Sequence, residues 1–147
     1  MCIRDRKYDG YRILAYKEGD RVTLLSRNSK DRTQFSSVAE AVANLTARTL
    51  LLDGEVVVFD REGISRFQLL QNLKSEPTYA VFDCLYRDGL DLRAEPLTNR
   101  RKILEEVIGN ANRESGGIFL SAMLAANGLK AFEVARRKGY EMSLIHI

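Results

Sequence analysis

The run from Lys7 to Arg12, Lys-Tyr-Asp-Gly-Tyr-Arg, is the part of the sequence best suited to chemistry. A free lysine has a pKa of ~10.4, and it becomes a nucleophile when burial or a nearby cation disfavours its ammonium form. Arg12 supplies a cation in the same run. We expect Gly10 to give backbone freedom for a turn and room for a ligand. The alternative is a hairpin that carries an exposed lysine.

A second candidate site is Asp53-Gly54-Glu55, which interrupts an apolar run from Leu50 to Val58. Carboxylates within a hydrophobic strand are costly unless they are paired or bound to a metal ion. Strand alternation places Asp53 and Glu55 on one face and Gly54 on the other. Two acids on one face suit a ribose hydroxyl or Mg²⁺. The alternative is an edge strand with an acidic outer face.

Three further segments offer binding groups. Phe82 can stack on a base, although an aromatic residue in a strand is more often part of the core. Arg27, in Ser-Arg-Asn, suits a phosphate or a ribose, and a solvated turn is the alternative. Arg100 and Arg101 can contact a nucleic-acid backbone or form a solvated helix face.

The elements that must position these residues follow from hydrophobic period and turn residues. Strands are predicted over residues 11–16, 21–25, 50–59, 78–86 and 118–120, with a hairpin turn at Gly19-Asp20. Helices are predicted over 38–45 with a serine cap, over 66–73, over 98–108 with Thr98 as cap, and from Asn127 to Gly139. This order predicts an α+β fold with mainly antiparallel sheets and flanking helices.

Bulk composition narrows the class of protein. The 147 residues are enough for one domain, and the net charge of +3 gives only a weak indication of a nucleic-acid partner. Two cysteines and one histidine argue against a structural zinc site. No apolar run approaches the ~20 residues that span a membrane, and no secretion signal is present. We therefore expect a cytoplasmic protein without a membrane partner.

The segments gain meaning from their order. Lys-x-Asp-Gly-x-Arg at Lys7, Ser-Arg-Asn at Arg27, Leu-Asp-Gly-Glu-Val at Glu55 and Phe-Asp at Phe82 together resemble the ATP-dependent DNA ligases, most closely the bacterial end-joining type. Supporting segments at 63–71 and 96–104 resemble the same family. The resemblance covers residues 7–141 and implies the nucleotidyltransferase (ATP-grasp-like) core, incomplete at the C-terminus.

The resemblance implies a role for each matching residue. Lys7 would be the catalytic nucleophile that takes AMP from ATP, and Mg²⁺ or Mn²⁺ would assist. Four residues would bind the nucleotide, with Phe82 stacking on adenine: Arg12, Arg27, Glu55 and Phe82. Glu55 and Glu141 would hold the metal. Asp9 and Gly10 would shape the loop. Arg27, Arg100 and Arg101 are possible DNA contacts. The partner would be nicked or broken double-stranded DNA, sealed by a monomer associated with the nucleoid through DNA.

The two ends depart from the family. Residues 1–5 and 143–147 can be encoded by one inverted repeat read in opposite directions, which resembles a transposon adapter from a sequencing library; the alternative is coincidence. We expect 1–6 and 142–147 to be foreign and 7–141 to be a partial adenylation domain. The family's later lysine motif and oligonucleotide-binding barrel are not found in the sequence. We therefore expect no nick sealing by the 147-residue chain alone.

Two other functions stay open on the sequence. The chain could act as a non-catalytic nucleotide- or DNA-binding fragment. It could also belong to an RNA ligase or capping-type nucleotidyltransferase, although the segments at Gln71 and at Arg100-Arg101 favour the DNA branch.

Overall fold

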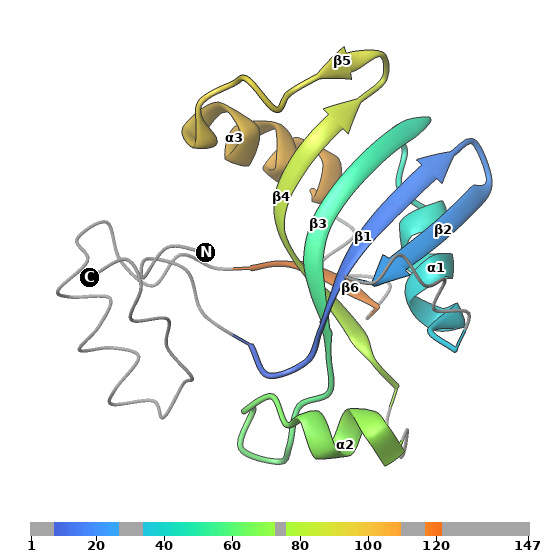
Figure 1. Ribbon diagram of the computed structural model, residues 1–147, viewed down its shortest axis with the longest axis vertical. Coiled ribbons are helices and arrows are strands. Elements are labelled where there is room, and N and C mark those ends of the chain that lie inside the picture. The colour runs from blue at the N-terminus through green and yellow to red at the C-terminus, as the bar shows by residue number, and fades with distance from the viewer. Residues whose placement is uncertain (1–7, 27–33, 73–75, 110–116, 122–147) are drawn as a thin grey trace, which may run out of the picture.

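The computed structural model describes residues 8–26, 34–72, 76–109 and 117–121. They form one curved sheet with three helices around it (Figure 1). The strands are β1 (Tyr11–Glu18), β2 (Arg21–Ser26), β3 (Thr49–Val57), β4 (Thr78–Arg87), β5 (Leu90–Asp91) and β6 (Ile118–Leu120). The helices are α1 (Ser36–Ala43), α2 (Phe67–Asn72) and α3 (Leu97–Ile108).

The sheet has the order β2-β1-β3-β4-β5, and every pair in that path is antiparallel. β6 adds a parallel partner to β4. β5 and β6 both pair with the outer edge of β4, at opposite ends of that strand. The predicted α+β class with mainly antiparallel strands is therefore confirmed.

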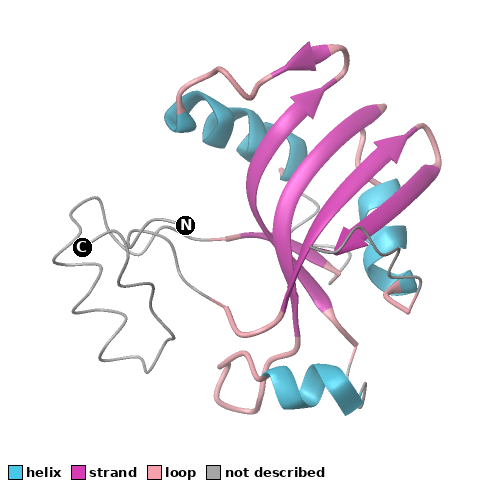
Figure 2. Ribbon diagram, viewed as in Figure 1, coloured by secondary structure: helices cyan, strands magenta, loops and turns pink. Residues whose placement is uncertain are grey.

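Alternation along the strands divides the sheet into a covered face and an open face. On β1 the fully buried residues are Ile13 and Ala15, whereas Arg12 and Tyr16, which flank them, are exposed. The covered face packs against α1 and α3 in one hydrophobic core, which includes Val38, Val42, Leu104 and Ile108. Figure 2 shows the strands in magenta, with both helices on the same side of them. Within the described residues, no helix covers the other face.

The predicted strands and turns agree with the structure, but both predicted helix caps are wrong. Phe35 occupies the N-cap position of α1 and Pro96 that of α3, and neither makes a side-chain capping bond. Ser36 and Leu97 are already the first helical residues, so Ser36-Ser37 and Thr98 lie inside the helices. A proline before the first turn is compatible with helix initiation because the first amide groups need no intrahelical partner. The predicted helix from Asn127 to Gly139 lies outside the described residues.

Within the described parts of the chain, no helix has the length and apolar character required to cross a lipid bilayer.

Candidate active site

The structure brings together three of the predicted binding residues on neighbouring strands. Arg12 lies on β1, Glu55 on β3 and Phe82 on β4. Arg12 and Glu55 are direct partners in the β1–β3 register, so their side chains share one face of the sheet. Lys7, Arg27 and Glu141 lie outside the described residues.

The loop after Lys7 is anchored at Tyr8 and Asp9. Tyr8 is only 2% exposed, and its ring makes edge-on contacts with Phe59 and Phe119. The Asp9 amide donates to Ser65 Oγ at 2.8 Å, and the Asp9 carboxylate accepts from the Phe67 amide at 3.1 Å. Phe67 opens α2, so Asp9 satisfies a helix-terminal amide from a distant part of the chain. These contacts tie the loop to the segment that enters α2.

Gly10 is required for a different reason from the one that the sequence suggested. Its backbone dihedral φ is not positive, so no left-handed turn is needed there. A Cβ at this position would lie 2.1 Å from the Val56 carbonyl oxygen and 2.9 Å from a Val57 methyl carbon. The loop therefore passes so close to β3 that only glycine fits.

Arg12 forms a forked ion pair with Asp53 across β1 and β3. Arg12 Nε lies 3.1 Å from Oδ1 and Nη2 lies 2.6 Å from Oδ2. The arginine side chain is 60% exposed and the aspartate side chain 10% exposed. The hydrogen bond to Asp53 raises the pKa of Arg12 against the opposing effect of partial burial, and the charges of Asp53 and Glu55 add to it. Asp53 thus holds the guanidinium group in one orientation.

The interpretation of Asp53 as a ribose or metal ligand needs revision. Both of its carboxylate oxygens accept from Arg12, which explains how a carboxylate is tolerated inside an apolar strand. Among the described residues, no group of three or more His, Cys, Asp or Glu side chains is placed to hold a metal ion. The described part of the chain therefore does not by itself form the expected Mg²⁺ site.

Phe82 lies at a β-bulge on β4. Asp53 pairs with Asp83 and Gly54 pairs with Val81, so Phe82 is an extra residue without a partner on β3. The Phe82 side chain is 8% exposed, and Arg12 Cζ lies 5.4 Å from the centre of its ring. This distance is within the range of a cation–π contact. The bulge thus brings the ring beside the Arg12–Asp53 pair.

Tyr79 also supports the site by linking its strands, and the sequence patterns did not identify this role. Its ring crosses Gly54, where a Cβ would lie 2.7 Å from the ring and 2.5 Å from the Ala80 carbonyl oxygen. Its hydroxyl donates to the Ile13 carbonyl at 2.7 Å, with the Leu52 carbonyl at 3.3 Å. Burial raises the pKa of this hydroxyl well above its ordinary value, with a further contribution from the Asp53 charge. The signal in the sequence was Gly54, because a glycine inside a strand often marks close approach by another group.

Arg100 and Arg101 make their described contacts inside the domain. Arg100 Nε lies 2.9 Å from Asp83 Oδ1, and both side chains are less than a fifth exposed, at 18% and 16%. Arg101 donates to the carbonyl oxygens of Phe82 and Ser121 at 3.1 and 2.6 Å. These contacts favour a structural role for both arginines over direct contact with DNA.

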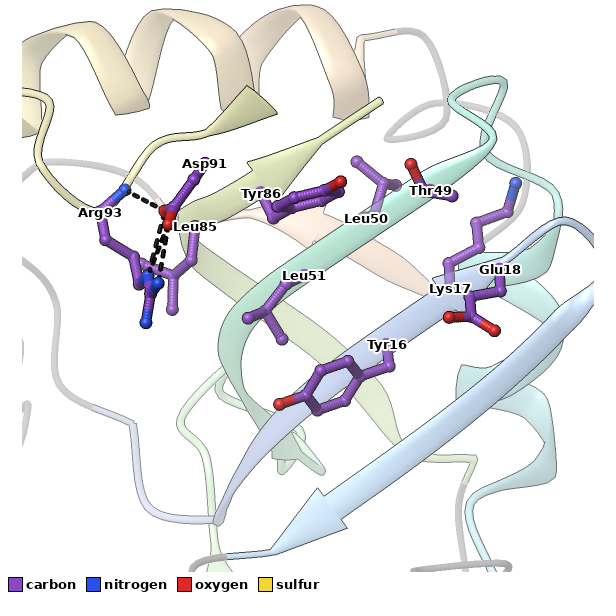
Figure 3. Close-up of a pocket in the computed structure, with 10 residues that line it drawn as sticks. All are labelled: Tyr16, Lys17, Glu18, Thr49, Leu50, Leu51, Leu85, Tyr86, Asp91 and Arg93. Carbon is purple, nitrogen blue, oxygen red and sulfur yellow. Dashed lines mark hydrogen bonds and ion pairs between the residues drawn. The ribbon is translucent and has the colours of Figure 1, made fainter. Parts of the chain in front are cut away.

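The open face carries two adjoining hollows that share Tyr16 and Leu85. One, of ≈ 720 Å³, is lined by Arg12, Asp53 and Ser26 among others. The other, of ≈ 390 Å³, continues along the sheet past Leu51 and Tyr86 to Asp91 and Arg93. Figure 3 shows Tyr16, Leu51 and Tyr86 side by side across three strands, with the Arg93–Asp91 ion pair beyond them. The Arg12–Asp53 pair therefore borders a broad, partly apolar surface.

Comparison with known proteins shows the family to which this chain belongs. Residues 1–142 match the family model described as ATP dependent DNA ligase domain. The chain is 37% identical over 141 residues to the multifunctional non-homologous end joining protein LigD of Pseudomonas aeruginosa, covering 92% of this chain and 16% of that protein. It is 33% identical over 138 residues to the corresponding LigD protein of Mycobacterium tuberculosis H37Rv, covering 92% and 18%. The chain thus spans about a sixth of the length of these relatives.

Solved structures of two mycobacterial ligases share the fold of this chain. The ligase domain of M. tuberculosis LigD superposes with a TM-score of 0.77 at 33% identity, over 94% of this chain and 46% of that one. A mycobacterial DNA ligase D complexed with ATP and MES gives a TM-score of 0.78 at 30% identity, over 94% and 45%.

The fold and the motif residues define a nucleotidyltransferase core. The chain belongs to the ATP-dependent DNA ligase family, and it corresponds to the adenylation domain of the bacterial end-joining type.

Proposed function

We propose that this domain takes AMP from ATP onto Lys7 as the first step of sealing a DNA strand. The observation that carries the proposal is the convergence of Arg12, Glu55 and Phe82 on adjacent strands, next to the anchored loop that follows Lys7. Membership of the ATP-dependent DNA ligase family supports it, as does the likeness to a mycobacterial ligase complexed with ATP.

In the proposed first step, the deprotonated Lys7 amine attacks the α-phosphorus of ATP. A phosphorus–nitrogen bond forms, the bond to the bridging oxygen breaks, and pyrophosphate leaves. The amine proton passes to solvent. Such chemistry depends mainly on positioning and on charge stabilisation of the phosphoryl group.

Three described residues have proposed roles in this step. Arg12 binds the sugar and phosphate side of the nucleotide with its exposed guanidinium group, which Asp53 holds in place. Glu55, on the same face, accepts from the ribose hydroxyls. Phe82 stacks on adenine. Of the residues outside the described ranges, Arg27 would contact ribose or a DNA phosphate, and Glu141 would join Glu55 in holding Mg²⁺ or Mn²⁺.

In the proposed later steps, AMP moves from Lys7 to the 5′-phosphate at a nick, which regenerates the amine. The 3′-hydroxyl then attacks that phosphate, forms the new strand linkage and expels AMP. The proposed substrate is nicked or broken double-stranded DNA, as the end-joining names of the relatives suggest.

Labelling with ATP tests the first step. The ligase polypeptide containing this domain is incubated with α-labelled ATP and separated on a denaturing gel. We expect label on the unchanged protein, none with γ-labelled ATP and none on Lys7→Ala. The matched control is Lys102→Ala, an exposed position on α3, which should label normally. Retention of label by Lys7→Ala would falsify the assignment.

A further inference from the structure

Among the described strands, Phe82 has no paired residue on either edge of β4. On the inner edge of β4, the bulge leaves Phe82 without a β3 partner. On the outer edge, β6 pairs only as far as Val81 and β5 pairs only from Tyr86 onward. The Leu92 amide, just after β5, donates to the Leu85 carbonyl, so the described part of the sheet has a gap in its edge pairing at residues 82–84. Backbone groups in such a gap need other partners when they are buried.

Arg101 fills the part of this gap that concerns Phe82. Its Nη1 donates to the Phe82 carbonyl at 3.1 Å and its Nη2 donates to the Ser121 carbonyl at 2.6 Å. The Ser121 amide in turn donates to the Val81 carbonyl at 2.8 Å. Arg101 thus takes the place of a strand neighbour, and it joins α3, β4 and the end of β6 in one hydrogen-bonded loop.

The residue that precedes Arg101 in α3, Arg100, binds Asp83, the residue that follows Phe82 in β4. Arg100 Nε donates to Asp83 Oδ1 at 2.9 Å, while its Nη1 donates to the Glu95 carbonyl at 2.8 Å. Two consecutive arginines therefore fix two consecutive residues at the bulge. Of these two arginines, Arg101 is the one that bonds to the backbone of Phe82, and so acts on the direction in which its ring leaves the strand.

We infer that Arg101 is a positioning residue that sets the orientation of the Phe82 ring beside Arg12. The inference deepens the proposed function, on which it rests for the meaning of the ring as an adenine platform. The guanidinium group is suited to this task because its planar fork can donate to two carbonyls at once, whereas a lysine ammonium offers a single point charge. This positioning role of Arg101 does not require direct contact with DNA.

The test uses two Arg101 variants of the 147-residue chain and two measurements. Aromatic NMR spectra report the Phe82 ring, which is identified among the six phenylalanines by its absence in Phe82→Leu. Equilibrium titration reports ATP affinity. In Arg101→Met we expect displaced Phe82 ring resonances and an ATP affinity lower by about five- to tenfold, the range for weakening one base–aromatic stack. Arg101→Lys should shift both in the same direction by less.

Glu106→Gln is the matched control. Glu106 pairs with Arg87 at 2.8 Å, so its loss weakens another contact between α3 and β4, at the end of β4 remote from Phe82. We expect unchanged Phe82 resonances and unchanged ATP affinity in this variant. An equal displacement of the ring in Glu106→Gln would overturn the inference, because the effect would then belong to helix packing in general.

The two readouts separate failure of the inference from failure of the proposed function. Phe82 resonances in Arg101→Met that superpose on those of the unchanged chain overturn the inference. If Arg101→Met does not fold, the Phe82 resonances of Arg101→Lys decide instead. Resonances that superpose on those of the unchanged chain then overturn the inference. An unchanged chain that fails to bind ATP counts against the proposed function, and the ring resonances still decide the role of Arg101.

Discussion

At the scale of single residues, the site depends on two glycines as well as on the residues that carry functional side chains. Gly10 and Gly54 both stand in the motif segments, and both allow another part of the chain to approach within van der Waals contact. Neither has a positive φ, so neither is needed for an unusual backbone conformation. The sequence indicated that glycine matters at these positions, but the reason is packing between the loop, β3 and Tyr79.

We predict that Gly54→Ala destabilises the domain by about 2–3 kcal/mol, the upper part of the range for overpacking a core. The added Cβ would lie 2.5 Å from the Ala80 carbonyl oxygen and 2.7 Å from the Tyr79 ring, and the backbone atom cannot move aside cheaply. Urea unfolding measures the change. The control is Gly63→Asn, in an exposed turn with φ of +77° and no atom within 4 Å, where asparagine tolerates the left-handed conformation. A smaller loss in Gly54→Ala than in the control would contradict the prediction.

At the scale of elements, carboxylates in turns hold neighbouring segments together. Asp88, in the turn between β4 and β5, accepts from the amides of Arg48 and Thr49 at 2.9 and 3.0 Å. It thereby ties that turn to the start of β3. These bonds lower the pKa of Asp88, the Thr49 amide contributing most. The Asp88-Gly89 sequence is typical of a turn, but it does not indicate the segment to which the turn is bonded.

We predict that Asp88→Asn loses stability at neutral pH and that the loss disappears in acid. Because the folded-state pKa of Asp88 is lowered, its contribution is present above the unfolded value of 3.8 and is lost as the pH falls through the folded value. Melting temperatures from about pH 7 to about pH 3 should therefore converge for the two proteins. Asparagine also tolerates the positive φ of 46° at this position, so the substitution isolates the charge. Asp20→Asn, in the exposed β1–β2 turn, is the control, and a gap between Asp88→Asn and the unchanged chain that persists at low pH would disprove the account.

At the scale of the whole molecule, strand order decides which distant residues meet. β3 lies between β1 and β4, so Arg12 and Phe82 come within 5.4 Å although seventy positions separate them in the chain. Tyr79 links the same three strands through its ring over Gly54 and its hydroxyl on the Ile13 carbonyl. The outer edge of β4 is shared by β5 and β6, which leaves the gap that Arg101 fills.

We predict that Tyr79→Phe lowers the free energy of unfolding by about 1–2 kcal/mol, because it removes a buried hydrogen bond and leaves carbonyl groups without this donor. Tyr86→Phe is the control on the same strand, since Tyr86 is 36% exposed, and it should change stability by less than about 0.5 kcal/mol. Denaturant titration of the three proteins measures both effects. Equal stabilities for Tyr79→Phe and the unchanged chain would show that the hydroxyl has no structural role.

The sequence by itself determined the features that depend on local pattern. Hydrophobic pattern and turn residues predicted five strands and the first hairpin, strand alternation predicted the shared face of Asp53 and Glu55, and the order of the motifs indicated the family. Helix caps were the local feature that it predicted wrongly, because Phe35 and Pro96 precede the first turns without a side-chain bond.

Only the tertiary structure decided which residues contact one another. Periodicity assigns a residue to a face but does not say which strand lies beside it. The pairing of Asp53 with Arg12, the bulge at Phe82 and the inward contacts of Arg100 and Arg101 all follow from strand order and from the placement of α3. These contacts depend on long-range packing, and they engage Asp53 and Arg101, two expected ligand-binding groups, with other residues of the domain.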